Sequence, residues 1–205
     1  HLLFFLKYNQ THFKSRDIDE DLVKFTLKEV QHYQQSEDGS WYDSSVRISP
    51  SDKVNSAMKM MIAYNTAGSY EFNYPERLID LCLNTINSTH ACNHFNIVCV
   101  LYYTCKLTDY RKHEILDYVT ERIKLYLEHY WEQHGAFSFF KGKSNSIYYN
   151  AKISRGFAEP DIHGTVMFIN GLALIADLLN IREKLTINNI EAMRCPENYL
   201  ISKSF

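Results

Sequence analysis

The hydrophobic positions along the chain follow two patterns that alternate. In the first pattern, apolar residues recur every three or four positions, which predicts a helix with one apolar face. This pattern occupies segments 20–35, 76–87 and 111–131. In the second pattern, apolar residues lie on all sides of the predicted helix, as in segments 53–66, 92–107 and 162–179. A helix of the second kind must be covered all round, whereas a helix of the first kind can face water.

This alternation predicts helical hairpins arranged in two layers, with the all-round apolar helices inside. We therefore predict an all-α protein built as an α/α toroid or an α-solenoid, with a plain helical bundle as the alternative. Three hairpins and a short helical segment at residues 2–9 make only part of a ring. We expect one domain over residues 1–181 and a tail at 182–205. A longer chain, of which this is the C-terminal part, or a homo-oligomer would complete the ring.

Composition narrows the function classes. The 205 residues include only 7 Gly and 4 Pro, which disfavours a turn-rich β fold. With 22 Lys and Arg against 24 Asp and Glu, the net charge of −2 offers no electrostatic footprint for nucleic acid. No apolar run reaches the ~18 residues that a transmembrane helix needs. Five cysteines without a C-x-x-C pair favour reduced thiols and a cytoplasmic protein.

Two segments carry a recognisable motif at the end of a one-sided helix. The stretch Gln35-Ser36-Glu37-Asp38-Gly39-Ser40-Trp41 has the form Q-x-x-x-G-x-W. It resembles the QW repeat of the squalene-hopene cyclase and terpenoid cyclase family. In such a repeat the glutamine ties helix ends, the glycine allows the turn and the tryptophan covers the hairpin. A weaker copy, with Phe for Trp, ends at Gly135-Ala136-Phe137.

A third segment, Asp161-Ile162-His163-Gly164-Thr165, opens the last apolar helix. It resembles the D-x-D-D-T start of the acid helix in class II cyclases and is similar to an inner helix of protein prenyltransferase β subunits. The cyclase resemblance implies an α/α toroid, in which the middle aspartate donates a proton; His163 stands at that position here. The prenyltransferase resemblance implies a zinc site, but the pattern D-x-C is replaced by His90-Ala91-Cys92.

In such a ring the inner helices start at one rim, where we expect the loops 36–52, 88–91 and 132–161 to converge. We predict acid or base roles there for Asp161, His163 and Glu159. The residues that we expect to bind substrate are Asp38, Trp41, Tyr148, Tyr149 and Arg155. Helix capping is the alternative role of Asp161. An alternative with zinc would use His90, Cys92 and His94 as ligands.

The function that we expect is that of a terpenoid-cyclase-like enzyme. It would hold an isoprenoid-type hydrophobic molecule in a central cavity and would need no cofactor. Two alternatives stay open, because the hallmark motifs are not intact. One is a non-catalytic toroid that serves binding or assembly. The other is a carbohydrate-active toroid, in which paired carboxylates cleave a glycan that stacks on the aromatic residues.

Overall fold

The computed structural model describes residues 2–13, 20–86 and 89–184, and this part of the chain is mostly helical, as predicted. The helices are α1 (Leu2–His12), α2 (Glu20–Gln31), α3 (Pro50–Ala67), α4 (Pro75–Asn84), α5 (Ala91–Thr104), α6 (Lys112–Leu127) and α7 (Ile162–Leu178). Two 3₁₀ turns are η1 (Glu132–His134) and η2 (Arg182–Lys184). The predicted tail lies outside the described residues from position 185 onward.

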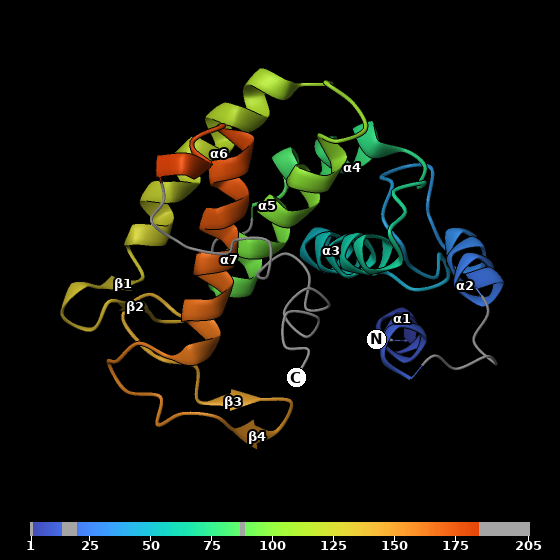
Figure 1. Cartoon of the computed structure of the whole chain (residues 1–205). Coiled ribbons are helices and arrows are strands. Elements are labelled where there is room, and N and C mark those ends of the chain that lie inside the picture. The colour runs from blue at the N-terminus through green and yellow to red at the C-terminus, as the bar shows by residue number, and fades with distance from the viewer. Residues whose placement is uncertain (1, 14–19, 87–88, 185–205) are drawn as a thin grey trace.

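The long connection between α6 and α7 carries two short β-hairpins. Strand β1 (Tyr130–Trp131) pairs with β2 (Ala136–Phe137), and β3 (Ile147–Tyr148) pairs with β4 (Ala151–Lys152), both antiparallel. The second hairpin lies at the lower edge of the molecule in Figure 1. No helix among the described residues combines the length and the apolar character that crossing a bilayer requires.

The helices are arranged in two rows. Helices α1, α3, α5 and α7 pack one against the next, and in Figure 1 they run from right to left across the picture. Helices α2, α4 and α6 flank this row, each packed on one or two of its members. The segments with apolar residues on all sides therefore lie side by side. The one-sided segments cover them, as the hydrophobic pattern predicts.

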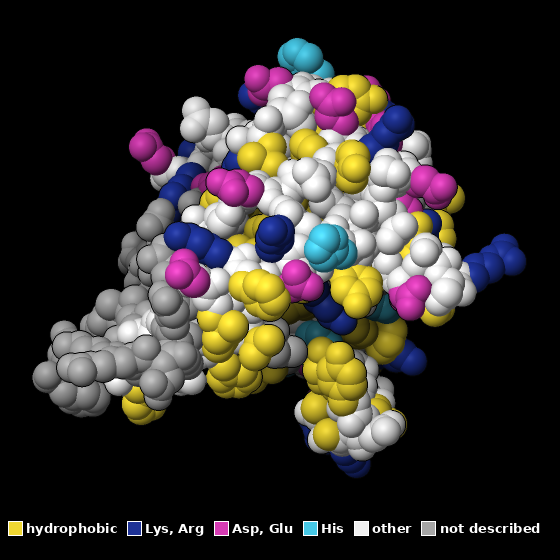
Figure 2. Space-filling model, turned by 90° about the vertical axis from the view of Figure 1, so that its right-hand side faces the viewer, with side chains coloured by type: hydrophobic (Ala, Val, Ile, Leu, Met, Phe, Trp, Pro, Cys, Tyr) yellow, Lys and Arg dark blue, Asp and Glu magenta, His cyan; other side chains and the backbone are white. Residues whose placement is uncertain are grey.

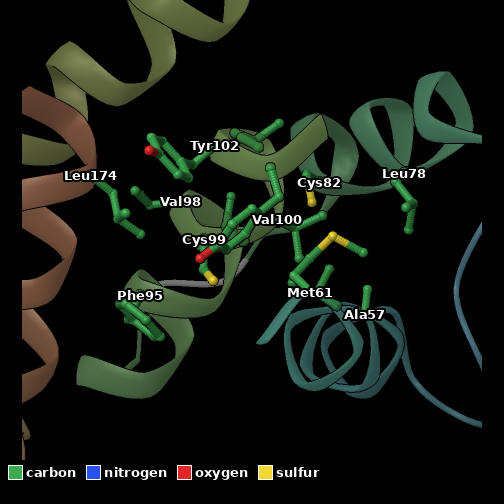
Figure 3. Close-up of a cluster of buried hydrophobic side chains, with 14 of the residues drawn as sticks. Ala57, Met61, Leu78, Cys82, Phe95, Val98, Cys99, Val100, Tyr102 and Leu174 are labelled. Carbon is green, nitrogen blue, oxygen red and sulfur yellow. The ribbon is translucent and has the colours of Figure 1, made fainter. Parts of the chain in front are cut away.

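Helix α5 is the centre of the core. Its side chains are buried almost throughout, and Val98, Cys99 and Val100 lie between the neighbouring helices (Figure 3). Met61 of α3 and Leu174 of α7 approach α5 from different sides. The four cysteines in the described part of the chain, at positions 82, 92, 99 and 105, are free thiols. A helix that is covered on all sides needs apolar residues on all sides, which explains its sequence pattern.

Three helices of the central row begin at a residue whose side chain caps the first turn. Ser49 caps α3, His90 caps α5 and Asp161 caps α7, each accepting a hydrogen bond from the backbone N–H three residues later. Such caps satisfy N–H groups that have no partner within the helix. By contrast, α4 and α6 follow Tyr74 and Arg111, which have positive φ and make no side-chain cap.

The Gln-Gly-Trp motif forms the connection after α2. The amide of Gln35 donates to the carbonyl oxygens of Tyr33 and Tyr42, and so joins both sides of the turn. Gly39 has a φ of +74°, and a Cβ there would lie 2.7 Å from the carbonyl oxygen of Tyr74. Trp41 is only 6% exposed. Gly39 and Trp41 thus have the turn and covering roles that the motif implies, whereas Gln35 joins two points within the connection rather than the ends of two helices.

Candidate functional site

A cysteine and a histidine meet at the beginning of two neighbouring helices of the central row. Cys92 is the second residue after the cap His90 of α5, and His163 is the second residue after the cap Asp161 of α7. Because α5 and α7 pack together, equal distances from their caps bring the two side chains opposite each other. The Sγ atom of Cys92 lies 3.3 Å from Nε2 of His163, and both residues are half-buried.

The other nitrogen of the imidazole faces an amide. Nδ1 of His163 lies 3.4 Å from the side-chain nitrogen of Asn145, which is 8% exposed and belongs to the loop between β2 and β3. As placed, the amide N–H would donate to Nδ1 and leave the imidazole hydrogen on Nε2. With the amide turned by 180°, its oxygen accepts from Nδ1–H instead. In that arrangement Nε2 carries the lone pair and faces the thiol. The rings of Phe139 and Tyr148, with centroids 4.4 and 4.7 Å from the imidazole, hold it in place.

Asp161 joins the loop to the helix that carries His163. Its Oδ1 accepts from the N–H of Gly164 at 2.8 Å. Its Oδ2 accepts from the N–H groups of Phe139 at 2.7 Å and Asn145 at 3.1 Å. Both oxygens are therefore used by the backbone, and one of these bonds positions Asn145. The predicted acid or base role of Asp161 stays a prediction, and its contacts are those of a capping residue.

Burial keeps both partners of the pair uncharged at neutral pH. It raises the pKa of the Cys92 thiol to about 11, although the charge of Lys59 acts in the opposite direction. Burial also lowers the pKa of His163 below its usual value, and the nearby charge of Asp161 only partly offsets this. The resting pair is a thiol beside a neutral imidazole. In this state the imidazole can accept the thiol proton.

The first turn of α5 supplies an N–H group beside the sulfur. The N–H of Ala91 donates to the carbonyl oxygen of Phe139 at 2.9 Å, and the N–H of Asn93 faces Nδ1 of His90 at 3.4 Å. The N–H of Cys92, between them, is in the same first turn, where a helix offers no internal acceptor. This group and the positive end of the helix dipole can stabilise negative charge next to Sγ.

Four further residues of the predicted site lie on the connection between α6 and α7. Tyr148 contacts His163, and Tyr149 follows it at the tip of the β3–β4 hairpin. Glu159 and Arg155 lie on the same connection but pair with each other, with 2.6 Å between Oε2 and Nη2. Residues 89–91 and 132–161 thus lie together as expected, and they supply the cap of α5 and the residues around His163. Residue 88 of the first loop lies outside the described residues.

The predicted residues of the loop 36–52 pack in the core and on α3 rather than near His163. Trp41 packs against Tyr64 and Phe72 in the core, so its ring is not presented to a ligand at the surface. Asp38 binds Lys53 of α3, with 2.6 Å between Oδ2 and Nζ. Their expected role in substrate binding is not favoured by these contacts. Both instead hold the connection between α2 and α3 together.

Replacing Asp38 by asparagine is expected to lower the free energy of unfolding by about 2 kcal/mol at pH 7, because a charge-assisted bond to Lys53 is lost. Burial alone would raise the pKa of Asp38, but hydrogen bonds from Lys53 and Ser40 outweigh it and lower that pKa. The contribution is therefore present above the unfolded-state pKa of about 3.9 and is lost as the pH falls further. Urea titrations at pH 7 and pH 3 should show the difference shrinking. The exposed Asp117→Asn is the control, and an equal loss there would contradict this assignment.

The three residues of the zinc alternative do not converge. His94 is 1% exposed and points toward α6, where its Nδ1 lies 3.3 Å from the guanidinium of Arg122 and its ring contacts Tyr126. Cys92 points toward α7, and the ring of His90 stacks on Phe139. Within residues 2–13, 20–86 and 89–184 no three His, Cys, Asp or Glu side chains form a group that could hold a metal ion.

Comparison with known protein families, with curated proteins and with solved structures finds no match to this chain. Cys92 and His163 are both predicted at the rim, but in different roles, Cys92 as a zinc ligand of the alternative and His163 as an acid or base. Asn145 is not among the predicted residues. The signal that pairs Cys92 with His163 is their equal distance from a capping residue on adjacent helices of the central row.

Proposed function

We propose that the protein is an enzyme in which Cys92 is the nucleophile and His163 its general base, acting on an acyl substrate. The observation that carries this proposal is the 3.3 Å separation between Sγ of Cys92 and Nε2 of His163. A nucleophile within hydrogen-bond reach of a base, with a third group behind that base, is the arrangement of cysteine-dependent acyl transfer. Asn145 is the third group here.

The chemistry needs only these groups, the substrate and water. As Sγ of Cys92 attacks the carbonyl carbon, its proton passes to Nε2 of His163, and the carbonyl oxygen becomes an oxyanion beside the N–H of Cys92. The carbon–leaving-group bond then breaks, and the leaving group takes the proton from His163. The remaining thioester is hydrolysed by water, whose proton also passes through His163. The acid is released and the thiol is restored.

The contacts of His163 suit a proton-transfer group better than those of Asp161. Three backbone N–H groups occupy the oxygens of Asp161. His163 instead presents Nε2 to a thiol that can give up a proton. Its environment also keeps the imidazole neutral, which a base must be.

Cys105 provides a matched control for a first test, because it is also half-buried and burial also raises the pKa of its thiol to about 11. At pH 8 iodoacetamide should alkylate Cys92 about 10²-fold faster than Cys105, since a general base contributes on that order. The advantage should fall as the pH drops through the lowered pKa of His163, because an imidazolium cannot accept the thiol proton. Peptide mass spectrometry over pH 5 to 9 measures both rates in one sample.

His163→Gln should bring Cys92 down to the rate of Cys105 while leaving Cys105 unchanged. Equal rates at the two cysteines in the unaltered protein would refute the proposed pair. A difference that persists in His163→Gln would assign the reactivity of Cys92 to another cause.

We also propose that the two rows of helices are part of an α/α toroid. The consecutive packing of α1, α3, α5 and α7, with α2, α4 and α6 outside, supports this architecture. An isoprenoid-type ligand is the second candidate, because the terpenoid-cyclase resemblance implies it. Native mass spectrometry with farnesyl diphosphate tests that candidate, and retention of the ligand that does not depend on Cys92 would favour it over acyl transfer.

A further inference from the structure

The turn of the β3–β4 hairpin is strained by its sequence. Tyr148 pairs with Ala151, so the turn consists of Tyr149 and Asn150, with φ values of +46° and +64°. Positive φ at both central residues is the geometry of the two-residue turn that Asn-Gly normally forms. Asparagine adopts it readily, but a tyrosine there costs on the order of 1 kcal/mol. Folding alone gives no reason for a tyrosine at this position.

The strained tyrosine belongs to an aromatic row that begins at the candidate base. The ring of Tyr148 lies 4.7 Å from the imidazole of His163, and the ring of Tyr149 lies 4.5 Å from that of Tyr148, both in edge-to-face arrangements. Tyr149 is 80% exposed and Ile147 is 60% exposed. In Figure 2 the hairpin is the lobe at the lower edge, and hydrophobic side chains gather on it.

We propose that the tip of this hairpin, Tyr148 and Tyr149, recognises an aromatic group on the acyl part of the substrate. This inference rests on the proposed Cys92–His163 chemistry. Centroid distances of 4.7 and 4.5 Å connect the imidazole to Tyr149 through Tyr148. A substrate whose ring lies against this tyrosine pair can therefore extend along the row toward Cys92 and His163. Offset or edge-to-face contact with tyrosine favours an aromatic over an aliphatic group of similar area. Residues 147–153 include no carboxylate, so the hairpin does not repel a neutral or anionic acyl group.

Alkylation tests this recognition without requiring the natural substrate. Two reagents, N-phenethyl iodoacetamide and N-propyl iodoacetamide, both transfer a carbon to Sγ with loss of iodide, and only the first carries a ring. We expect the phenethyl reagent to alkylate Cys92 about 10-fold faster than the propyl reagent. Cys105 in the same sample should show no such preference. Rates are measured on the full chain by peptide mass spectrometry.

Variants of the turn separate recognition from folding. Tyr149→Asn removes the ring and gives the turn a residue suited to positive φ, so the preference should drop about 5-fold or more while the thermal midpoint stays equal or rises. Tyr149→Phe retains the ring and should retain the preference. Tyr33→Ala, which removes an exposed tyrosine on another part of the surface, should retain it as well.

The outcomes distinguish this inference from the function on which it rests. If Cys92 reacts faster than Cys105 with both reagents but shows no preference for the ring, the hairpin is not the recognition element and the Cys–His chemistry stands. A preference that survives in Tyr149→Asn also overturns the inference. If Cys92 reacts no faster than Cys105 with either reagent, the proposed function itself fails.

Discussion

Replacing Cys92 by serine is expected to reduce turnover of an aromatic p-nitrophenyl ester by about 10³-fold or more, because a hydroxyl is a far weaker nucleophile than a thiol beside the same base. His163→Gln should cost about 10²- to 10⁴-fold, the usual contribution of a general base. Release of nitrophenol measures the rate. Mass spectrometry of the unaltered protein, quenched during turnover, should show the acyl group on the peptide that contains Cys92.

Cys105→Ser is the control for this experiment. Lys112 and Asp109, rather than a histidine, are the charged groups that act on that half-buried thiol in the described part of the chain, so it should be replaceable without loss of rate. Turnover that survives in Cys92→Ser would remove the cysteine from the mechanism. Stoichiometric zinc in the purified protein, lost in the same variant, would instead indicate that the two side chains are metal ligands with partners outside the described residues.

Replacing Gly164 by alanine is expected to cost about 4 kcal/mol of unfolding free energy, at the upper end for a single substitution. Gly164 lies within a regular helix, so its backbone conformation suits alanine. The added Cβ, however, would lie 2.4 Å from the N atom of Phe139 and 2.5 Å from the carbonyl carbon of Ser138. These are backbone atoms that cannot turn away. Relieving the contact requires moving the loop whose N–H group binds Asp161.

Urea unfolding followed by circular dichroism measures this effect. Ile162→Ala, in the same turn of α7 but with its side chain 84% exposed, should change stability by less than about 0.5 kcal/mol. A loss in Gly164→Ala no larger than in this control would mean that the loop and α7 are not in the close contact described. If Gly164→Ala is stable but its Cys92 is alkylated slowly, the contact between α7 and the loop positions the Cys92–His163 pair and contributes little to stability.

The layered arrangement could be predicted from the sequence because it depends on periodicity alone. Helix α5 has apolar residues on all sides because neighbouring helices cover it on all sides. The apolar pattern in the sequence therefore predicts this burial. Helix α3 shows where the inference weakens. It looks apolar all round in the sequence, but Ile62 is 42% exposed, because the helix lies farther along the row and is less completely covered.

The site was harder to predict than the layers. Residue type and position near a helix start identified Cys92 and His163, but the distance between them depends on the register of two helices, which periodicity does not define. Trp41 illustrates a different difficulty. An aromatic residue in a loop resembles a ligand-binding residue in sequence, whereas the structure uses it to close the connection between α2 and α3. Asn145 carries no sequence signal, because its role comes only from the loop that Asp161 holds.

The position of the two capping residues determines which insertions the Cys92–His163 pair can tolerate. Cys92 and His163 each lie two residues after a capping residue, His90 and Asp161 respectively. A residue inserted between a cap and its partner would rotate the side chain by about 100° around the helix axis and separate the pair. An insertion near the far end of α5 or α7 would leave both positions untouched. The far ends of these helices, in contrast, do not enter the spacing that brings the two side chains together.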